Sequence, residues 1–303
     1  MNVTSTTNTT LPTAPAPPSI SNQQFAVLGL MVGNTLEVAI GGIISIGIFH
    51  LSGENPGKGS MKINWTSLLM VNFNFAAIIY MAWFIADWWL DGSNCVIGSI
   101  LDNAASHYFY LSFDLFILFK TCVISGYNRV VVVMAAVIYL NRTSWSALDI
   151  AKSGGSWDPD GQLCSYVQFP LSGLGYNASD IITDLFASVV SVIFTLKHIK
   201  SGFNKIGQVI MQENVLRSLI MLGVNCFEMY ASFTITSPFL TLVAYMIQNY
   251  TYTRCLNLEI MWIGVRRRSA KTGKKQAGSS NSTSFFSKVV KAFSRSEMSH
   301  AEA

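Results

Sequence analysis

Long apolar runs separated by short polar stretches cover most of this chain. Seven runs can be counted, and each reaches the roughly 17 residues that a helix needs at least to cross a bilayer. Asn141 and Arg142 interrupt the fourth run. The pattern predicts an all-α fold, a bundle of seven transmembrane helices, with approximate bounds 24–51, 67–90, 96–126, 130–148, 180–196, 215–236 and 238–268. The start of the third run could lie as late as residue 104.

Polar segments flank the predicted bundle on both sides. Residues 1–23 carry no charge and are rich in Thr, Ser, Asn and Pro, so they predict an extracellular disordered tail. Residues 24–265 form the predicted transmembrane domain, and residues 266–303 a basic cytoplasmic tail. Within that tail, 284–297 has the spacing of an amphipathic helix that lies on an anionic inner leaflet. The alternative is a helix that binds a partner or forms only transiently.

Composition and charge support a membrane protein and set its orientation. Half of the 303 residues are apolar and 12% are charged, whereas a soluble protein carries about a quarter charged residues. With the N-terminus outside, basic residues gather on the cytoplasmic loops and tail, and the external loops hold only Arg142 and Lys152. This asymmetry follows the positive-inside rule. We expect a multi-pass plasma membrane protein, N-terminus out and C-terminus in, whose surroundings are lipid and not nucleic acid.

Three sites match the acceptor pattern for N-glycosylation, at Asn2, Asn8 and Asn177. An acceptor is used only where the enzyme can reach it on the external side. We expect an exposed and glycosylated N-terminal tail, and the alternative is an unmodified tail.

Two of the five cysteines fall outside the predicted spans. Cys95 precedes the third span, and Cys164 lies in the long loop after the fourth. In the N-out orientation both face the oxidising side, where disulfides persist. We expect a Cys95–Cys164 bridge that holds the external loop over the mouth of the bundle. The alternative is two free or separately paired thiols.

Seven spans, an external N-terminus and this cysteine placement resemble the rhodopsin-like class of G-protein-coupled receptors, over about residues 24–268. The first span carries Gly33-Asn34-Thr35-Leu36, which is similar to the family's Gly-Asn-x-Leu. Asp102 lies seven residues after Cys95, where a subset of members carries a ligand-binding aspartate, although a carboxylate at a helix boundary is common by chance. The resemblance implies a receptor that couples an unknown extracellular ligand to a cytoplasmic heterotrimeric G protein.

The chain departs from the family's pattern at its switch motifs. The register from Cys95 brings Lys120 to the place of the Asp/Glu-Arg-Tyr motif, the sixth span has no proline, and the seventh lacks Asn-Pro-x-x-Tyr. The resemblance assigns partner contact to the basic residues of the cytoplasmic loops, Lys120, Arg129, Lys197, Lys200 and Lys205.

Ionisable residues inside the predicted spans are the strongest candidates for function, because charges facing lipid are costly. Glu37, Asp114, Glu228 and Arg254 all fall near the middle depths of their spans. We expect Arg254 to pair with Glu228, or else with Asp114, and amides such as Asn225 to complete a ligand pocket or a switch. The alternative is that these groups only join the helices to one another.

No enzyme motif emerges from the sequence. The four histidines lack metal-ligand spacing, and no phosphate loop or local nucleophile motif occurs. We therefore expect no catalysis and no cofactor. The alternative to a receptor is a proton- or ion-coupled transporter or channel that uses the buried charges. A membrane scaffold acting through its basic tail is a third reading.

Overall fold

The computed structural model describes residues 21–53, 65–87, 89–159, 163–200, 205–235 and 237–276. The chain divides into two compact units, Met1–Leu258 and Glu259–Ala303. The described part of the second unit is the final stretch of one helix, so the architecture belongs to the first unit. Asn2, Asn8 and the predicted helix near 284–297 lie outside the described residues.

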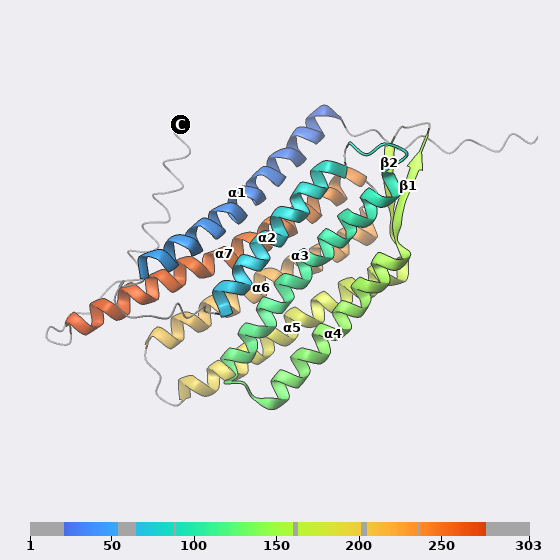
Figure 1. Cartoon of the computed structure of the whole chain (residues 1–303). Coiled ribbons are helices and arrows are strands. Elements are labelled where there is room, and N and C mark those ends of the chain that lie inside the picture. Colours follow the sequence, from blue (N-terminus) through green and yellow to red (C-terminus); the bar gives the residue numbers. More distant parts are fainter. Residues whose placement is uncertain are drawn as a thin grey trace, which may run out of the picture. The chain divides into compact units, whose positions relative to one another are not determined.

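The described chain is predominantly helical, as predicted (Figure 1). Its helices are α1 (Asn22–Gly53), α2 (Trp65–Asp87), α3 (Cys95–Ile124), α4 (Arg129–Lys152), α5 (Pro170–Lys200), α6 (Lys205–Thr234) and α7 (Pro238–Gln276). The long loop after α4 forms an antiparallel hairpin that the sequence did not predict, made of β1 (Gly154–Asp158) and β2 (Leu163–Val167). Within this hairpin Trp157 pairs with Cys164.

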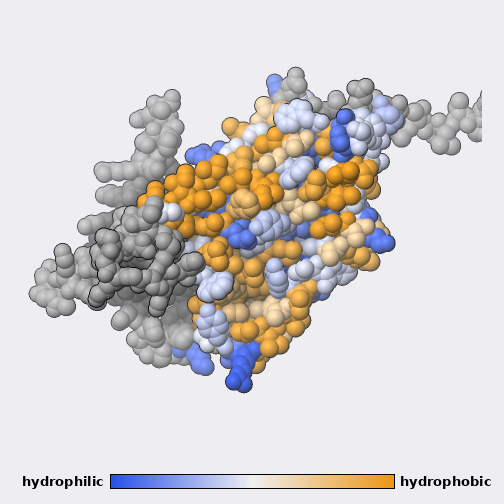
Figure 2. All heavy atoms as spheres, in the orientation of Figure 1, coloured by the Kyte–Doolittle hydropathy of each residue, from blue (hydrophilic) through white to orange (hydrophobic). Residues whose placement is uncertain are grey.

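The face of the first unit that Figure 2 shows carries large apolar areas, with polar residues between them. Large apolar side chains such as Leu30, Ile44 and Leu140 are more than half exposed. Five helices, α1 to α5, are long and apolar enough to cross a membrane, whereas the described residues of α6 and α7 do not reach that hydropathy. An apolar exterior around a polar interior is the arrangement that hydrocarbon favours.

Helices that follow one another in sequence pack together through most of the first unit. α2 contacts α1 and α3, α4 contacts α3 and α5, and α5 contacts α6 and also α3. The first-unit part of α7 joins this group through polar side chains. Asn257 donates to the carbonyl of Val38 in α1 at 3.1 Å and to Asn74 in α2 at 2.7 Å. A side chain at Gly42 of α1 would collide with Asn257, so this approach depends on a glycine.

A tight turn joins α3 to α4. Gly126 and Tyr127 both take positive φ angles, 64° and 57°, and their amides donate to the carbonyls of Val123 and Cys122. This is the Schellman arrangement that ends many helices, with glycine at the left-handed position. The Asn128 side chain then caps α4 by accepting from the amide of Val130.

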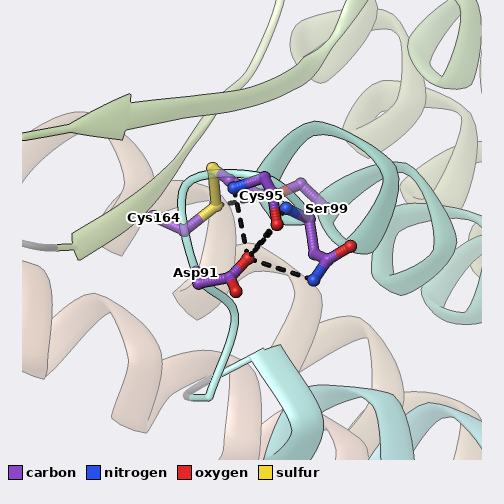
Figure 3. Close-up of a disulfide and its surroundings, with 6 residues drawn as sticks. Asp91, Cys95, Ser99 and Cys164 are labelled. Atoms are coloured by element: carbon purple, nitrogen blue, oxygen red, sulfur yellow. Dashed lines mark hydrogen bonds between the residues drawn. A yellow bond between two sulfur atoms is a disulfide. The ribbon is translucent and has the colours of Figure 1, made fainter.

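A disulfide joins Cys95, at the start of α3, to Cys164 in β2, with the two Cα atoms 5.5 Å apart (Figure 3). The Ser99 hydroxyl lies 3.3 Å from the Cys164 sulfur. The hairpin is therefore held against the first turns of α3. In the preceding loop, Asp91 accepts from the Ser93 hydroxyl and the Asn94 amide, and these bonds hold the pKa of Asp91 below its usual range.

Gly155 controls how closely the hairpin approaches α3. A Cβ there would lie 2.5 Å from the Ser99 hydroxyl and 2.7 Å from the Cys95 carbonyl, whereas a Cβ at Gly154 would meet nothing within 4 Å. We expect Gly155→Ala to lower the free energy of unfolding by about 1–3 kcal/mol through overpacking. Gly154→Ala is the matched control. Equal melting temperatures for the two purified variants in detergent would contradict the close approach.

Candidate functional site

A fully buried arginine occupies the middle of α4. Arg142 has 0% of its surface exposed, and its Nε donates to Asp114 of α3 at 3.0 Å. Its Nη1 donates to the carbonyl of Tyr176 in α5, and its Nη2 forms an ion pair with Asp180 of α5 at 3.2 Å. The guanidinium also lies over the Tyr176 ring, with Cζ 3.4 Å from the ring centroid. Arg142 therefore links three helices.

The sequence-based assignment of the buried cation was wrong. Arg142, which was placed on the external side, is the internal cation, and α4 continues through it without a break. The side chains of Arg254 and Glu37 are exposed, and among the described residues Arg254 makes no pair with Glu228. Depth along a span does not determine which face of the helix a residue occupies, because neighbouring positions differ by about 100°. The buried face of a helix is determined by its packing against other helices.

Asn225 of α6 is the centre of a second group of buried polar side chains. Its amide donates to Asp184 of α5 at 2.6 Å. Its carbonyl oxygen accepts from the Tyr252 hydroxyl at 2.5 Å and from Gln248 at 3.0 Å, both in α7. These contacts place Asn225 among buried polar groups, and its part in a ligand pocket or switch stays a prediction.

Hydrogen bonds join the two groups into one network. The Tyr252 hydroxyl lies 3.1 Å from Asp180, which also holds Arg142. In the other direction, Gln248 donates to Glu228 at 2.8 Å and can accept from the Tyr110 hydroxyl of α3 at 2.8 Å. The network therefore spans α3, α4, α5, α6 and α7.

The network holds more acid than base. Asp114 and Asp180 contact the Arg142 guanidinium, Asp184 and Glu228 are each less than a tenth exposed, and Arg217 of α6 is a second buried cation. Buried carboxylates without a full set of counter-charges are costly to retain. Four carboxylates of this network therefore lie among two buried guanidinium groups, those of Arg142 and Arg217, within the described residues.

A pocket of about 230 Å³ opens beside the network, at the hairpin end of the first unit. Residues of α2, α3, α4, β2, α5, α6 and α7 line it. Three of them, Tyr110, Tyr176 and Glu228, also contact the network, so the pocket and the network share side chains. Asp102, a predicted ligand contact, lines the pocket from α3.

Asp149, near the end of α4, is hydrogen-bonded to several elements of the pocket wall. It accepts from the hydroxyls of Ser153, Tyr166 and Ser172, and the His107 ring lies 3.0 Å away. These partners come from α3, the hairpin and α5 as well as from the end of α4. Burial raises the pKa of the Tyr166 phenol, which keeps this hydroxyl a donor to Asp149. The hairpin is thus attached to the pocket by hydrogen bonds as well as by the disulfide.

The predicted glycosylation of Asn177 is wrong. This residue lies inside α5 and lines the pocket, and Ser179 of the same acceptor pattern is 2% exposed. The Ser179 hydroxyl is bonded to the Gly175 carbonyl and to Asn141. A helical acceptor packed into a bundle does not present the extended, exposed chain that glycosylation needs.

The basic residues assigned to partner contact lie at helix ends opposite the pocket. Lys120 is half-buried in the last turns of α3, Arg129 begins α4 and is exposed, and Lys197 is exposed near the end of α5. Lys200 and Lys205 lie at the end of α5 and the start of α6, and their side chains lie outside the described residues.

Sequence reasoning missed several network residues, although one signal was present. Asp180 and Asp184 are four residues apart, so they share a face of α5. Two carboxylates on one face of a span favour a cation on a neighbouring helix, and Arg142 within an apolar run was one candidate. Tyr252 and Gln248 carried no comparable signal, because neutral polar residues are common in membrane helices.

Comparison with known proteins adds no family assignment. No protein-family model matches the chain, and no curated protein sequence matches it. Within the described residues, no group of three or more His, Cys, Asp or Glu side chains is arranged to hold a metal ion. The geometry of the pocket and network is therefore the basis for a functional assignment.

Arg142 and Arg254 provide a direct test of which cation the fold requires. We expect Arg142→Leu to lower the free energy of unfolding by about 3–5 kcal/mol, because it leaves Asp114 and Asp180 buried without their cation. Arg254→Leu should change it by about 0.5 kcal/mol or less, because that side chain is exposed. Thermal unfolding of both purified variants in detergent would measure this. A larger loss for Arg254→Leu would contradict the assignment.

Proposed function

We propose that this chain is a seven-helix integral membrane receptor that senses an extracellular stimulus and signals to a cytoplasmic partner. In this proposal α6 and α7 cross the bilayer with the five more apolar helices, and the disulfide-held hairpin faces outside. The apolar exterior and the basic residues at the helix ends away from the hairpin support this orientation. A heterotrimeric G protein is the proposed partner, by resemblance to the rhodopsin-like receptors.

The observation that carries the proposal is the sharing of side chains between pocket and network. Glu228 lines the pocket and accepts from Gln248, which also bonds Asn225. A ligand that displaces Glu228 would therefore disturb the buried groups around Asn225 and Arg142. Packed interiors of this kind switch between discrete arrangements, which lets a small movement at the pocket become a larger one elsewhere.

α3 provides the route from the pocket to the other end. Asp102 and Tyr110 line the pocket, Asp114 holds Arg142, and Lys120 lies near the turn to α4. From Asp102 to Lys120 is 18 residues, or ~27 Å at ~1.5 Å per residue. A rotation or shift of this one helix would reach both the ligand and the partner.

The excess of buried acid favours a second candidate, a proton-coupled transporter. Chains of carboxylates and hydroxyls inside a membrane domain are typical of proton relays. Hydrogen bonds connect the carboxylates of Glu228 and Asp180 through the Tyr252 hydroxyl and the carboxamides of Gln248 and Asn225, from the pocket into the interior. A transporter would use that chain to carry charge, whereas a receptor would use it to change shape.

Reconstitution separates the two candidates. Purified protein in liposomes would be tested for nucleotide exchange on added G proteins and, separately, for pH-driven flux of protons and small solutes. The receptor proposal expects exchange without flux. Flux without exchange would support the transporter, and absence of both would overturn each proposal.

Gln248→Leu tests the link between pocket and network. It removes the donor to both Glu228 and Asn225, so it should release the resting arrangement and raise basal nucleotide exchange about fivefold or more. Thr251→Val is the matched control in α7, because the Thr251 hydroxyl bonds only the Ile247 carbonyl of its own helix. Unchanged basal exchange in folded Gln248→Leu protein would show that the network does not hold the resting state.

A further inference from the structure

Three polar side chains of the pocket wall have buried atoms without a hydrogen-bond partner among the described residues. These atoms are the amide nitrogen of Asn103, Nδ1 of His107 and the hydroxyl of Tyr176. All three residues line the pocket, and each is more than nine-tenths buried. Buried polar groups in native proteins are normally satisfied, so these atoms indicate a polar occupant.

The three groups lie where α3 packs against α5. Asn103 and His107 are four residues apart, so they share one face of α3. The His107 ring meets the Tyr176 ring of α5 edge-on, with the ring centroids 4.8 Å apart. Together they form one polar wall between the two helices.

Asp149 fixes the hydrogen-bonding character of His107. Both of its carboxylate oxygens accept from hydroxyl groups, which come from Ser153, Ser172 and Tyr166. Because an ionised carboxylate only accepts, the hydrogen of a neutral His107 ring must lie on Nε2, which is 3.0 Å from Asp149. Nδ1 is then an acceptor. Asp149 is thus a positioning residue for His107.

The wall therefore needs a ligand that both donates and accepts. The Asn103 amide nitrogen donates, His107 Nδ1 accepts, and the Tyr176 hydroxyl can do either. An ammonium group has only donors and leaves Asn103 without a partner, whereas a carboxylate has only acceptors and leaves His107 without one. A hydroxyl group donates and accepts through a single oxygen. Several hydroxyls on one small frame can therefore satisfy the whole wall.

The rest of the lining also fits a neutral polar ligand. Ser106, Gln168 and Asn177 add side chains that donate and accept, and the carboxylates of the lining are acceptors for hydroxyl groups. Tyr80 and Tyr110 add aromatic rings, against which the C–H faces of a sugar can pack. A volume of about 230 Å³ is below the roughly 300–1,000 Å³ of sites for drug-sized ligands, which suits a single sugar ring.

We propose that this pocket binds a small neutral polyol of the size of one sugar ring, held by Asn103, His107 and Tyr176. One hydroxyl of the ligand accepts from the Asn103 amide, a second donates to His107 Nδ1, and a third pairs with the Tyr176 hydroxyl. This ligand class rests on the proposed function, because it treats the pocket as the place where the stimulus binds.

Titration calorimetry on the purified full chain, in a detergent without a sugar headgroup, tests the ligand class. myo-Inositol is compared with cyclohexanol, cyclohexylamine and cyclohexanecarboxamide, which carry one hydroxyl, one ammonium and one carboxamide on the same ring. D-glucose and D-xylose are further polyol probes. We expect at least one polyol to bind about tenfold or more tightly than each single-group compound, because several hydrogen bonds replace one.

Two variants remove an unpartnered group and nearly preserve the shape of the site. Asn103→Leu and Tyr176→Phe should each weaken polyol binding about fivefold or more, because a hydrogen bond to the ligand is lost. Tyr108→Phe is the matched control, because its hydroxyl bonds Asn72 and the residue is not among the described residues of the pocket lining. Its affinity should stay within about twofold of the unmodified protein.

The melting temperature without ligand separates binding from packing. A group without a partner adds no stabilising hydrogen bond, so Asn103→Leu and Tyr176→Phe should leave this temperature unchanged or raise it. A fall in both variants would show that the two groups have partners in the ligand-free fold, and would overturn the site. If Asn103→Leu alone fails to fold, Tyr176→Phe decides the test.

Three binding results would also overturn the polyol site. They are no polyol binding, a single-group compound that binds as tightly as every polyol, and a loss of affinity in Tyr108→Phe equal to that in Tyr176→Phe. Nucleotide exchange by a protein that binds no polyol would retain the receptor and refute this ligand class. Polyol binding to a protein that drives flux and no exchange would retain the site and refute the receptor.

Discussion

Burial of the Arg142 guanidinium is the constraint on which the helix arrangement depends. A charge in an apolar interior is retained only where carboxylates and carbonyls surround it. Here Asp114 of α3, with Asp180 and the Tyr176 carbonyl of α5, meet that need, so α3 and α5 must both converge on α4 at one depth. A shift of any of them would leave an ionised group without its partner.

The hairpin and the pocket follow from that convergence. Asp149 lies two helical turns beyond Arg142 on α4, and it gathers hydroxyl donors from the hairpin and α5. The Cys95–Cys164 bridge fixes the hairpin to α3. The pocket wall is consequently built on rigid elements. A rigid wall whose side chains also belong to a buried network is well suited to converting ligand binding into helix movement.

The excess of buried carboxylates over buried cations bears on both proposed functions, the receptor and the transporter. The same imbalance that would let a transporter carry protons would let a receptor rearrange its buried charges between two states. The two uses differ in whether the charged groups exchange protons along the chain or rearrange as a unit. Glu228 matters to both because it belongs to the pocket and to the network.

The sequence by itself predicted the helical class, the approximate helix positions and the pairing of Cys95 with Cys164. Apolar run length and redox side depend on local composition, so they can be read without coordinates. The tertiary structure alone decided that Arg142 is buried and Arg254 exposed, that Asn177 lies within a packed helix, and that Tyr166 of a hairpin lines the pocket. These outcomes depend on which face of each helix meets its neighbours. The buried face of each helix is set by pairing between residues that lie far apart in the chain. A single apolar run does not contain that information.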